Sequence, residues 1–308
     1  MTRRTAASAP HPIAFTIGSR RLLTVDREMV TLAFSLHDVL TGRLPAVPSL
    51  ARVEGLRVLS APAAAEARLR QVMPGFLVGG RDVFARSYID MGGSYERYLA
   101  QFSGKTRSTL RRKRRKLEQA DGGTLDLRAY RTPDEIAEFA ALAEPLSQRT
   151  YQARLLDAGL PQGADALAEM QGLAAQDRLR AFLLFLGGQP IAYLYLPVDG
   201  DTLIYAHLGY DPAHAGLSPG TVLQMAALEA LFAEQRFRYF DFTEGDGPHK
   251  ALFRTASERC ASLLLLRPSL ANRMLLGSLD IFDRSVAGAK ALAAKSGAEG
   301  LLRRALRG

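Results

Sequence analysis

The chain has 308 residues, of which 47% are hydrophobic, and a formal net charge of +9. This length is enough for one large domain or two modest ones with a buried core. A single cysteine excludes an internal disulfide, and no apolar run approaches the roughly 20 residues that span a bilayer. No apolar leader follows Met1, so we expect a cytoplasmic protein.

The positive charge is concentrated in two stretches. Residues 105–116 contain eight basic residues and no acidic one, and residues 267–308 contain eight basic residues against three acidic ones. Together these stretches more than account for the net charge. The pattern predicts anion contacts at particular places rather than a surface that binds nucleic acid everywhere.

The first hundred residues contain no group of side chains with a recognisable chemistry. A helix is predicted at residues 63–71. Strand-like runs occupy residues 13–17, 21–25, 29–34, 56–59 and 82–91. We interpret this part of the chain as a scaffold.

Residues 94–119 are predicted to be helical, with a break near Ser103 and Gly104. On a helix that begins at Lys105, Leu110 and Leu117 lie one above the other, while basic side chains occupy almost the whole circumference. Only a narrow stripe of this helix can be buried. The helix is either solvated or binds a substrate's phosphates, acidic lipid headgroups or a nucleic-acid backbone, and the residues leave these alternatives open.

Two sharper local signals follow. Thr132, Pro133 and Glu135 form a capping box, which predicts a helix to about residue 143 that Pro145 ends or kinks. The pair Gly187-Gly188 separates two strand-like runs and predicts a tight hairpin. The flanking strands are predicted at residues 179–186 and 190–196, after a helix at residues 164–175.

The centre of the chain is a strand, a loop and the start of a helix. Residues 202–208 form the strand, Ser218 stands at the N-cap position, and Gly220 and Thr221 open an apolar run that continues to about residue 234. A helix start of this kind exposes backbone N–H groups and the positive end of the helix dipole, and Gly220 has no side chain to keep a phosphate away. The alternative is an ordinary capped helix without a ligand.

A second group of polar residues follows the strand predicted at residues 237–243. Glu244 and Asp246 lie in a glycine-flanked turn, and His249 and Lys250 come directly after it. Either acid, or the imidazole, has the chemistry of a general base, and Lys250 has that of a phosphate or substrate ligand. Each acid is equally well explained as a turn residue that bonds its own backbone.

The last part of the chain is predicted to be structural. Cys260 lies in a strand at residues 260–266 and has no activating neighbour, so we expect a buried core thiol. Residues 269–307 predict one long amphipathic helix and a shorter one. An apolar stripe at helical spacing indicates docking on the domain rather than insertion in a membrane. Its members are Leu270, Met274, Leu275, Leu279 and Phe282.

Five segments of the sequence resemble GNAT acyltransferases of the CelD/FemAB-like branch: residues 103–117, 149–152, 207–212, 217–221 and 240–250. The resemblance implies an α/β fold of two tandem GNAT-like halves, with mixed, mostly antiparallel sheets flanked by helices. It implies a degenerate N-terminal half at residues 1–97, an acyltransferase domain at residues 98–266 and a basic helical tail at residues 267–308.

The resemblance also implies a co-substrate, acetyl-CoA or another acyl-CoA. Its pantetheine would lie beside the backbone of His207 and Leu208. Its pyrophosphate would rest on Leu217, Ser218, Gly220 and Thr221. The sequence departs from the family's pyrophosphate motif, because Ala215 stands where Arg or Gln is usual. No His or Cys cluster has the spacing of metal ligands, so no metal is expected.

The catalytic candidates are Glu244 and Asp246 first and His249 second. The candidate substrate ligands are Arg149, Tyr151, Lys250, Arg111 and Arg115. The acceptor would be an amino sugar or a sugar- or lipid-linked envelope precursor that bears phosphate, and the protein could also touch an anionic membrane surface. Three alternatives stay open: aminoacyl transfer from tRNA, as in FemAB-type proteins, a non-enzymatic nucleic-acid-binding protein, and a degenerate fold that serves as an assembly partner.

Overall fold

The computed structural model describes residues 9–17, 20–51, 53–150, 159–245 and 247–295. Its contacts divide the chain into two units. The first comprises the residues up to Arg86 and those from Glu258 onward, and the second is Ser87–Ser257. The chain enters the second unit within strand β4 and returns within strand β11. The C-terminal tail therefore groups with the N-terminal residues, whereas the degenerate GNAT character of residues 1–97 stays a prediction.

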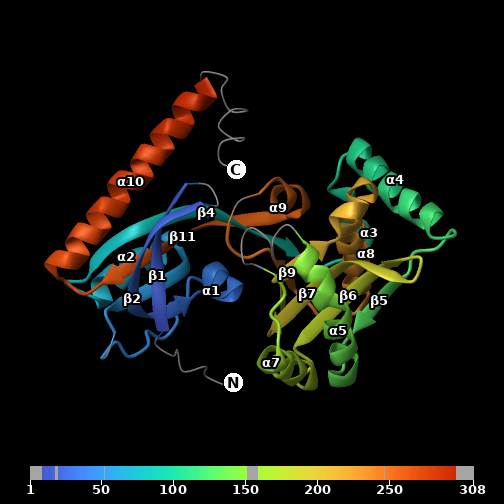
Figure 1. The fold of residues 1–308 in the computed structure, drawn as a ribbon, viewed down its shortest axis with the longest axis horizontal. Coiled ribbons are helices and arrows are strands. Elements are labelled where there is room, and N and C mark those ends of the chain that lie inside the picture. The colour runs from blue at the N-terminus through green and yellow to red at the C-terminus, as the bar shows by residue number, and fades with distance from the viewer. Residues whose placement is uncertain (1–8, 18–19, 52, 151–158, 246, 296–308) are drawn as a thin grey trace. The chain divides into compact units, whose positions relative to one another are not determined.

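The first unit is a five-stranded mixed sheet with helices (Figure 1). Its elements are β1 (Ala9–Ile17), β2 (Arg20–Ala33), α1 (Leu36–Thr41), β3 (Gly55–Pro62), α2 (Ala63–Val72), β4 (Leu77–Asp90), β11 (Ala256–Leu266) and α10 (Leu270–Lys295). The strand order is β1-β2-β3-β11-β4, in which β2 and β3 are parallel and the pairs β1–β2 and β3–β11 antiparallel. Cys260 is buried in β11, as predicted.

Helix α10 packs through part of the predicted apolar stripe. Leu275 and Leu279 are buried in one cluster with Ile13 and Phe15 of β1. Leu270 is exposed, as is Met274, so the prediction that they dock is wrong. The reason is the helical period, which places Leu270 about 140° away from Leu275 around the axis. The shorter second helix predicted for the tail lies outside the described residues.

The second unit is also a mixed sheet covered by helices (Figure 1). Its elements are α3 (Tyr95–Ala100), α4 (Gly104–Ala120), β5 (Leu127–Tyr130), α5 (Pro133–Arg149), α7 (Ala164–Ala175), β6 (Leu179–Leu186), β7 (Gln189–Asp199), β8 (Thr202–Ile204), β9 (His207–Tyr210), the 3-10 helix η1 (Pro212–Leu217), α8 (Pro219–Ala233), β10 (Tyr239–Asp241) and α9 (Pro248–Phe253). The strand order is β4-β10-β8-β7-β6-β5, and β9 pairs with β7.

The central strands of this sheet are buried on both faces. Along β6, Phe182 and Leu184 belong to the cluster that contains the apolar residues of α8. The alternate residues Ala181 and Leu183 belong to the cluster that contains those of α5 and α7. Side chains of a strand point alternately to its two faces, so a layer of helices covers each side. This explains why β6 reads as a continuous apolar run.

Most of the local predictions for the second unit are confirmed. The hairpin β6–β7 turns at Gly187 and Gly188, which both have positive φ. The capping box of Thr132 and Glu135 is present at the start of α5. Helix α5 nevertheless continues past Pro145 to Arg149. It does so because Pro145 is on the exposed side, where water can satisfy the freed carbonyl, while Leu146 and Ser147 directly after it are buried.

The strand predicted at residues 202–208 is two strands. β8 runs parallel to β10. The pairing ends with a hydrogen bond from the backbone N–H of Tyr205 to the carbonyl of Asp241 at 2.9 Å. β9 then pairs with β7, with Leu208 opposite Leu194. Within the described residues, no strand pairs with the other edge of β9. The sheet therefore opens between β9 and the segment after β10. The mixed, mostly antiparallel α/β fold is confirmed.

Candidate functional site

The first turn of α8 differs from the predicted capped start. Ser218 occupies the N-cap position, but its backbone is left-handed (φ 55°, ψ 47°) and its side chain makes no capping hydrogen bond. The backbone N–H groups of Thr221 and Val222 donate to the carbonyl of Ser218 at 3.1 and 3.2 Å. Among the described residues, the structure gives no acceptor for the amide of Gly220. The expected set of several free amides is therefore reduced to this one.

Gly220 is needed for the packing of α8 on β9. A Cβ at this position would lie 3.1 Å from a side-chain atom of Leu208 and 3.2 Å from one of Tyr210. Neighbouring side chains would have to give way for any larger residue. The glycine thus faces side chains of β9 rather than an open loop, and α8 begins against that strand.

Two lysines of α4 reach the start of α8. Lys113 Nζ donates to Thr221 Oγ1 at 3.4 Å, and Lys116 Nζ donates to the carbonyl of Gly216 in η1 at 3.0 Å. Leu117, fully buried, anchors the same face of α4 in the core. The basic helix therefore adds two cations to the positive end of the α8 dipole, where an anion is stabilised.

Helix α9 brings His249 against the second turn of α8. Its ring Nε2 forms a hydrogen bond with Oε1 of Gln224, whose side chain is fully buried. An amide oxygen only accepts, so Nε2 of the imidazole carries the hydrogen and Nδ1 keeps a lone pair. Among the described residues, the amide nitrogen of Gln224 has no hydrogen-bond partner. The pair thus contains one acceptor, Nδ1 of His249, and one buried donor, the amide nitrogen of Gln224, that its own hydrogen bond does not use.

Burial and neighbouring cations keep this imidazole neutral. Desolvation first, and then the charges of Lys113 and Lys250, lower the pKa of His249 from 6.5 to about 4. The rings of Tyr205 and Phe253 lie beside it, with centroids at 6.3 and 4.8 Å. His249 is therefore a neutral group at physiological pH, placed between α8 and the opening of the sheet.

The lowered pKa of His249 predicts a pH effect on folding. Between pH 6.5 and pH 4 the unfolded chain binds a proton that the folded chain does not, so stability falls as the pH falls through this window. The loss amounts to roughly 3 kcal/mol at most. Urea unfolding at pH 7 and pH 4.5 measures it, and His249→Gln should remove it. His37→Gln, which removes an exposed imidazole, should leave the pH dependence unchanged; an unchanged dependence in both variants contradicts the prediction.

The turn after β10 lies close to the same place. Lys250 Nζ donates to the backbone carbonyl of Glu244, and Lys250 also lowers the pKa of His249. Glu244 is half-buried in this turn. The other predicted acid, Asp246, lies outside the described residues, as does the predicted substrate ligand Tyr151. Their predicted roles stay predictions.

The remaining predicted substrate ligands are separated. Arg149 forms an ion pair with Asp211 at 3.2 Å, and Asp211 in turn accepts from the backbone of Ala213, so Arg149 holds the loop that leads to α8. Arg111 lines a cavity between α3, α4 and α8. Arg115 is exposed and is not among the residues that line this cavity.

Sequence reasoning missed three residues of this site, namely Gln224, Lys113 and Lys116. Gln224 is a polar residue inside the apolar run of α8, and this interruption was the available signal. Lys113 was one of eight basic residues in its stretch, and only the packing of Leu117 shows which way it points. The described residues contain no group of three or more potential metal ligands, and none of their helices is long and apolar enough to cross a membrane.

A sheet that opens beside a strand edge, with a cationic helix start and a neutral imidazole next to it, suits a group-transfer protein. Residues 104–251 match the family described as an acetyltransferase (GNAT) domain. Residues 104–251 therefore form a GNAT-type domain, and the chain is an acyl or aminoacyl transferase. The predicted GNAT membership and the enzyme class are confirmed.

Three solved structures are similar to this chain. FemX matches with a TM-score of 0.55 and 10% identity, over 87% of this chain and 90% of FemX. L-PGS from Bacillus licheniformis matches with a TM-score of 0.47 and 15% identity, over 72% of this chain and 71% of L-PGS. A GCN5-related N-acetyltransferase from Kribbella flavida matches with a TM-score of 0.36 and 13% identity, over 71% of this chain and 70% of that protein. No curated protein matches the sequence. The likeness to FemX concerns the fold alone.

Proposed function

We propose that the protein is an acyl-CoA-dependent N-acyltransferase that acts on an amino sugar or a polysaccharide or cell-envelope precursor by direct attack on the thioester. The observation that carries the proposal is the convergence of Lys113 and Lys116 on the start of α8, next to the unpaired edge of β9. A diphosphate needs cations and a helix start. A pantetheine arm, which contains amides, needs an unpaired strand edge.

The residues present fit such a co-substrate. Lys113, Lys116 and the amide of Gly220 would bind the pyrophosphate, and they replace the Arg or Gln that the family motif has at the position of Ala215. The backbone of His207 and Leu208 would pair with the pantetheine. These assignments keep His207, Leu208 and Gly220 of the predicted set and add the two lysines. They leave out Leu217, Ser218 and Thr221, and the amides of the last two donate to backbone carbonyls.

The chemistry then requires one proton acceptor. The acceptor's amine attacks the thioester carbonyl, a C–N bond forms, and the nitrogen becomes a strongly acidic ammonium. Nδ1 of His249 takes that proton, the C–S bond breaks, and the proton passes to the leaving thiolate. A base with a pKa of about 4 suits this acidic ammonium better than a hydroxyl, which favours an amine acceptor. Glu244 and Asp246 are the competing candidates.

The CoA site predicts a specific loss of affinity. Lys113→Gln should weaken the binding of CoA about tenfold, because one charge-assisted contact to a phosphate is lost. Isothermal titration calorimetry of the full chain with CoA measures the effect. Lys113 is a cleaner target than Gly220, where a glutamate would also disturb β9.

The control is Arg112→Gln, which removes the same charge from the exposed face of the same helix. It should change the affinity less than twofold. Equal effects of both variants would mean that only the overall charge of α4 matters. Absence of any CoA or acyl-CoA binding by the wild-type protein would overturn the proposed donor.

A second candidate is aminoacyl transfer from charged tRNA to a peptidoglycan-type precursor. The observation that favours it is the basic face of α4 away from α8, where Lys105, Arg112 and Arg115 are exposed. Such a face suits a nucleic-acid backbone, and its contacts would weaken steeply with salt. Transfer of a labelled amino acid from tRNA, without CoA, would support this candidate.

A further inference from the structure

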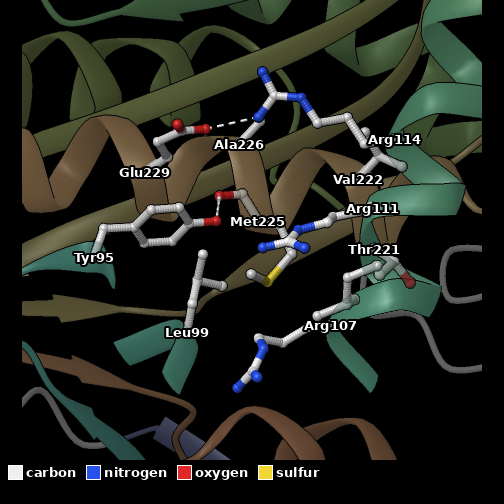
Figure 2. Close-up of a pocket in the computed structure, with 11 residues that line it drawn as sticks. Tyr95, Leu99, Arg107, Arg111, Arg114, Thr221, Val222, Met225, Ala226 and Glu229 are labelled. Carbon is white, nitrogen blue, oxygen red and sulfur yellow. Dashed lines mark hydrogen bonds and ion pairs between the residues drawn. The ribbon is translucent and has the colours of Figure 1, made fainter. Parts of the chain in front are cut away.

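A cavity of about 210 Å³ lies between α3, α4 and α8 of the second unit. Its wall is largely apolar and is formed by one face of each helix. The apolar residues that line it are Tyr95, Leu99, Leu110, Val222, Met225 and Ala226. The hydroxyl of Tyr95 donates to the carbonyl of Met225 at 3.0 Å, so the tyrosine presents its ring rather than its polar end (Figure 2).

Three arginines, one glutamate and Thr221 complete the lining. Arg114 is neutralised, since it forms ion pairs with Glu118 and Glu229 at 2.8 and 2.7 Å. Arg107 donates to the backbone carbonyls of Ala100 and Phe102, which leaves its charge without a carboxylate. These contacts leave an uncompensated positive charge at the cavity.

Arg111 is the second uncompensated cation. Among the described residues it has no ion pair or hydrogen bond, and it is exposed. Figure 2 shows its side chain reaching from α4 across the cavity towards Tyr95. A guanidinium with five donors above an apolar wall matches a ligand with an anionic head and an apolar body.

We propose that this cavity binds an anionic amphiphile, namely a hydrocarbon chain that ends in a phosphate. The chain packs on Leu99 and Met225, and the phosphate bonds Arg111 and Arg107. Thr221 lines the cavity and also accepts from Lys113, so the cavity adjoins the start of α8. The inference rests on the proposed function in one respect: it identifies the acceptor as a lipid-linked phosphate.

Calorimetric titration of the full chain with alkyl phosphates tests the proposal. Octyl phosphate should bind more tightly than butyl phosphate, by about fourfold for each methylene that enters the cavity. Inorganic phosphate and the neutral octyl glucoside should bind at least tenfold more weakly than octyl phosphate. Arg111→Gln should lower the affinity for octyl phosphate about tenfold. Arg112→Gln, which changes the exposed neighbouring residue, should leave this affinity unchanged.

Three results would overturn the proposal: equal binding of octyl phosphate and octyl glucoside, equal binding of inorganic and octyl phosphate, or equal effects of the two arginine variants. A second variant, Ala226→Leu, fills part of the cavity and should weaken octyl phosphate but not butyl phosphate. The same samples titrated with CoA separate the two proposals. If the wild-type protein binds CoA but not octyl phosphate, only the proposed amphiphile site is overturned. If it binds octyl phosphate but not CoA, only the proposed acyl-CoA donor is overturned.

Discussion

Replacing His249 with glutamine is expected to lower kcat for acyl transfer to an amine by roughly 100-fold or more. The glutamine keeps a side chain of similar length against Gln224, but its amide is too weakly basic to take the ammonium proton. Because His249 is neutral and is not among the pyrophosphate ligands, the Kd for CoA should change less than twofold. Thiol release from acetyl-CoA, with glucosamine as the probe acceptor, measures the rate.

Two comparison variants decide between the candidate bases. Glu244→Gln should lower kcat less than tenfold, because His249 stays in place to take the proton. Gln224→Leu removes the acceptor that fixes the imidazole tautomer, and it should lower kcat without a change in CoA affinity. A large effect of Glu244→Gln together with a near-normal His249→Gln would assign the base to Glu244.

The elements with strong local signals were predictable from the sequence. The hairpin at Gly187 and Gly188 requires positive φ, and the capping box of Thr132 and Glu135 is a purely local motif. The break at Ser103 is equally local, since this residue caps α4 with its own side chain. In each case a few neighbouring residues determine the conformation without help from the rest of the chain.

The candidate site was predictable only in outline. The sequence places His249 and Gly220 near chain segments that the fold brings together, but nothing in it pairs His249 with Gln224, 25 residues away. The direction of Lys113 depends on how α4 packs on α8, and the split of residues 202–208 into two strands depends on β10. These features come from long-range packing, which overrides local preference.

Gly209 is expected to be among the most sensitive positions of β9. It lies directly opposite Tyr193 of β7, and a Cβ built on it would come within 2.4 Å of the tyrosine ring. That ring is 1% exposed and is held by a hydrogen bond to Ser147 at 3.0 Å, so it has no free space to move. Gly209→Ala should therefore lower the free energy of unfolding by about 2–3 kcal/mol, as measured by urea denaturation.

The control is Gly216→Ala in η1, where a Cβ meets no atom within 4 Å, and its stability should stay close to that of the wild type. A double-mutant cycle separates the clash from other effects. If the ring of Tyr193 is the obstacle, Gly209→Ala combined with Tyr193→Leu should destabilise by at least about 1 kcal/mol less than the sum of the single changes. Strict additivity would contradict this explanation. CoA affinity of Gly209→Ala should fall as well, because β9 then cannot keep its edge beside the start of α8.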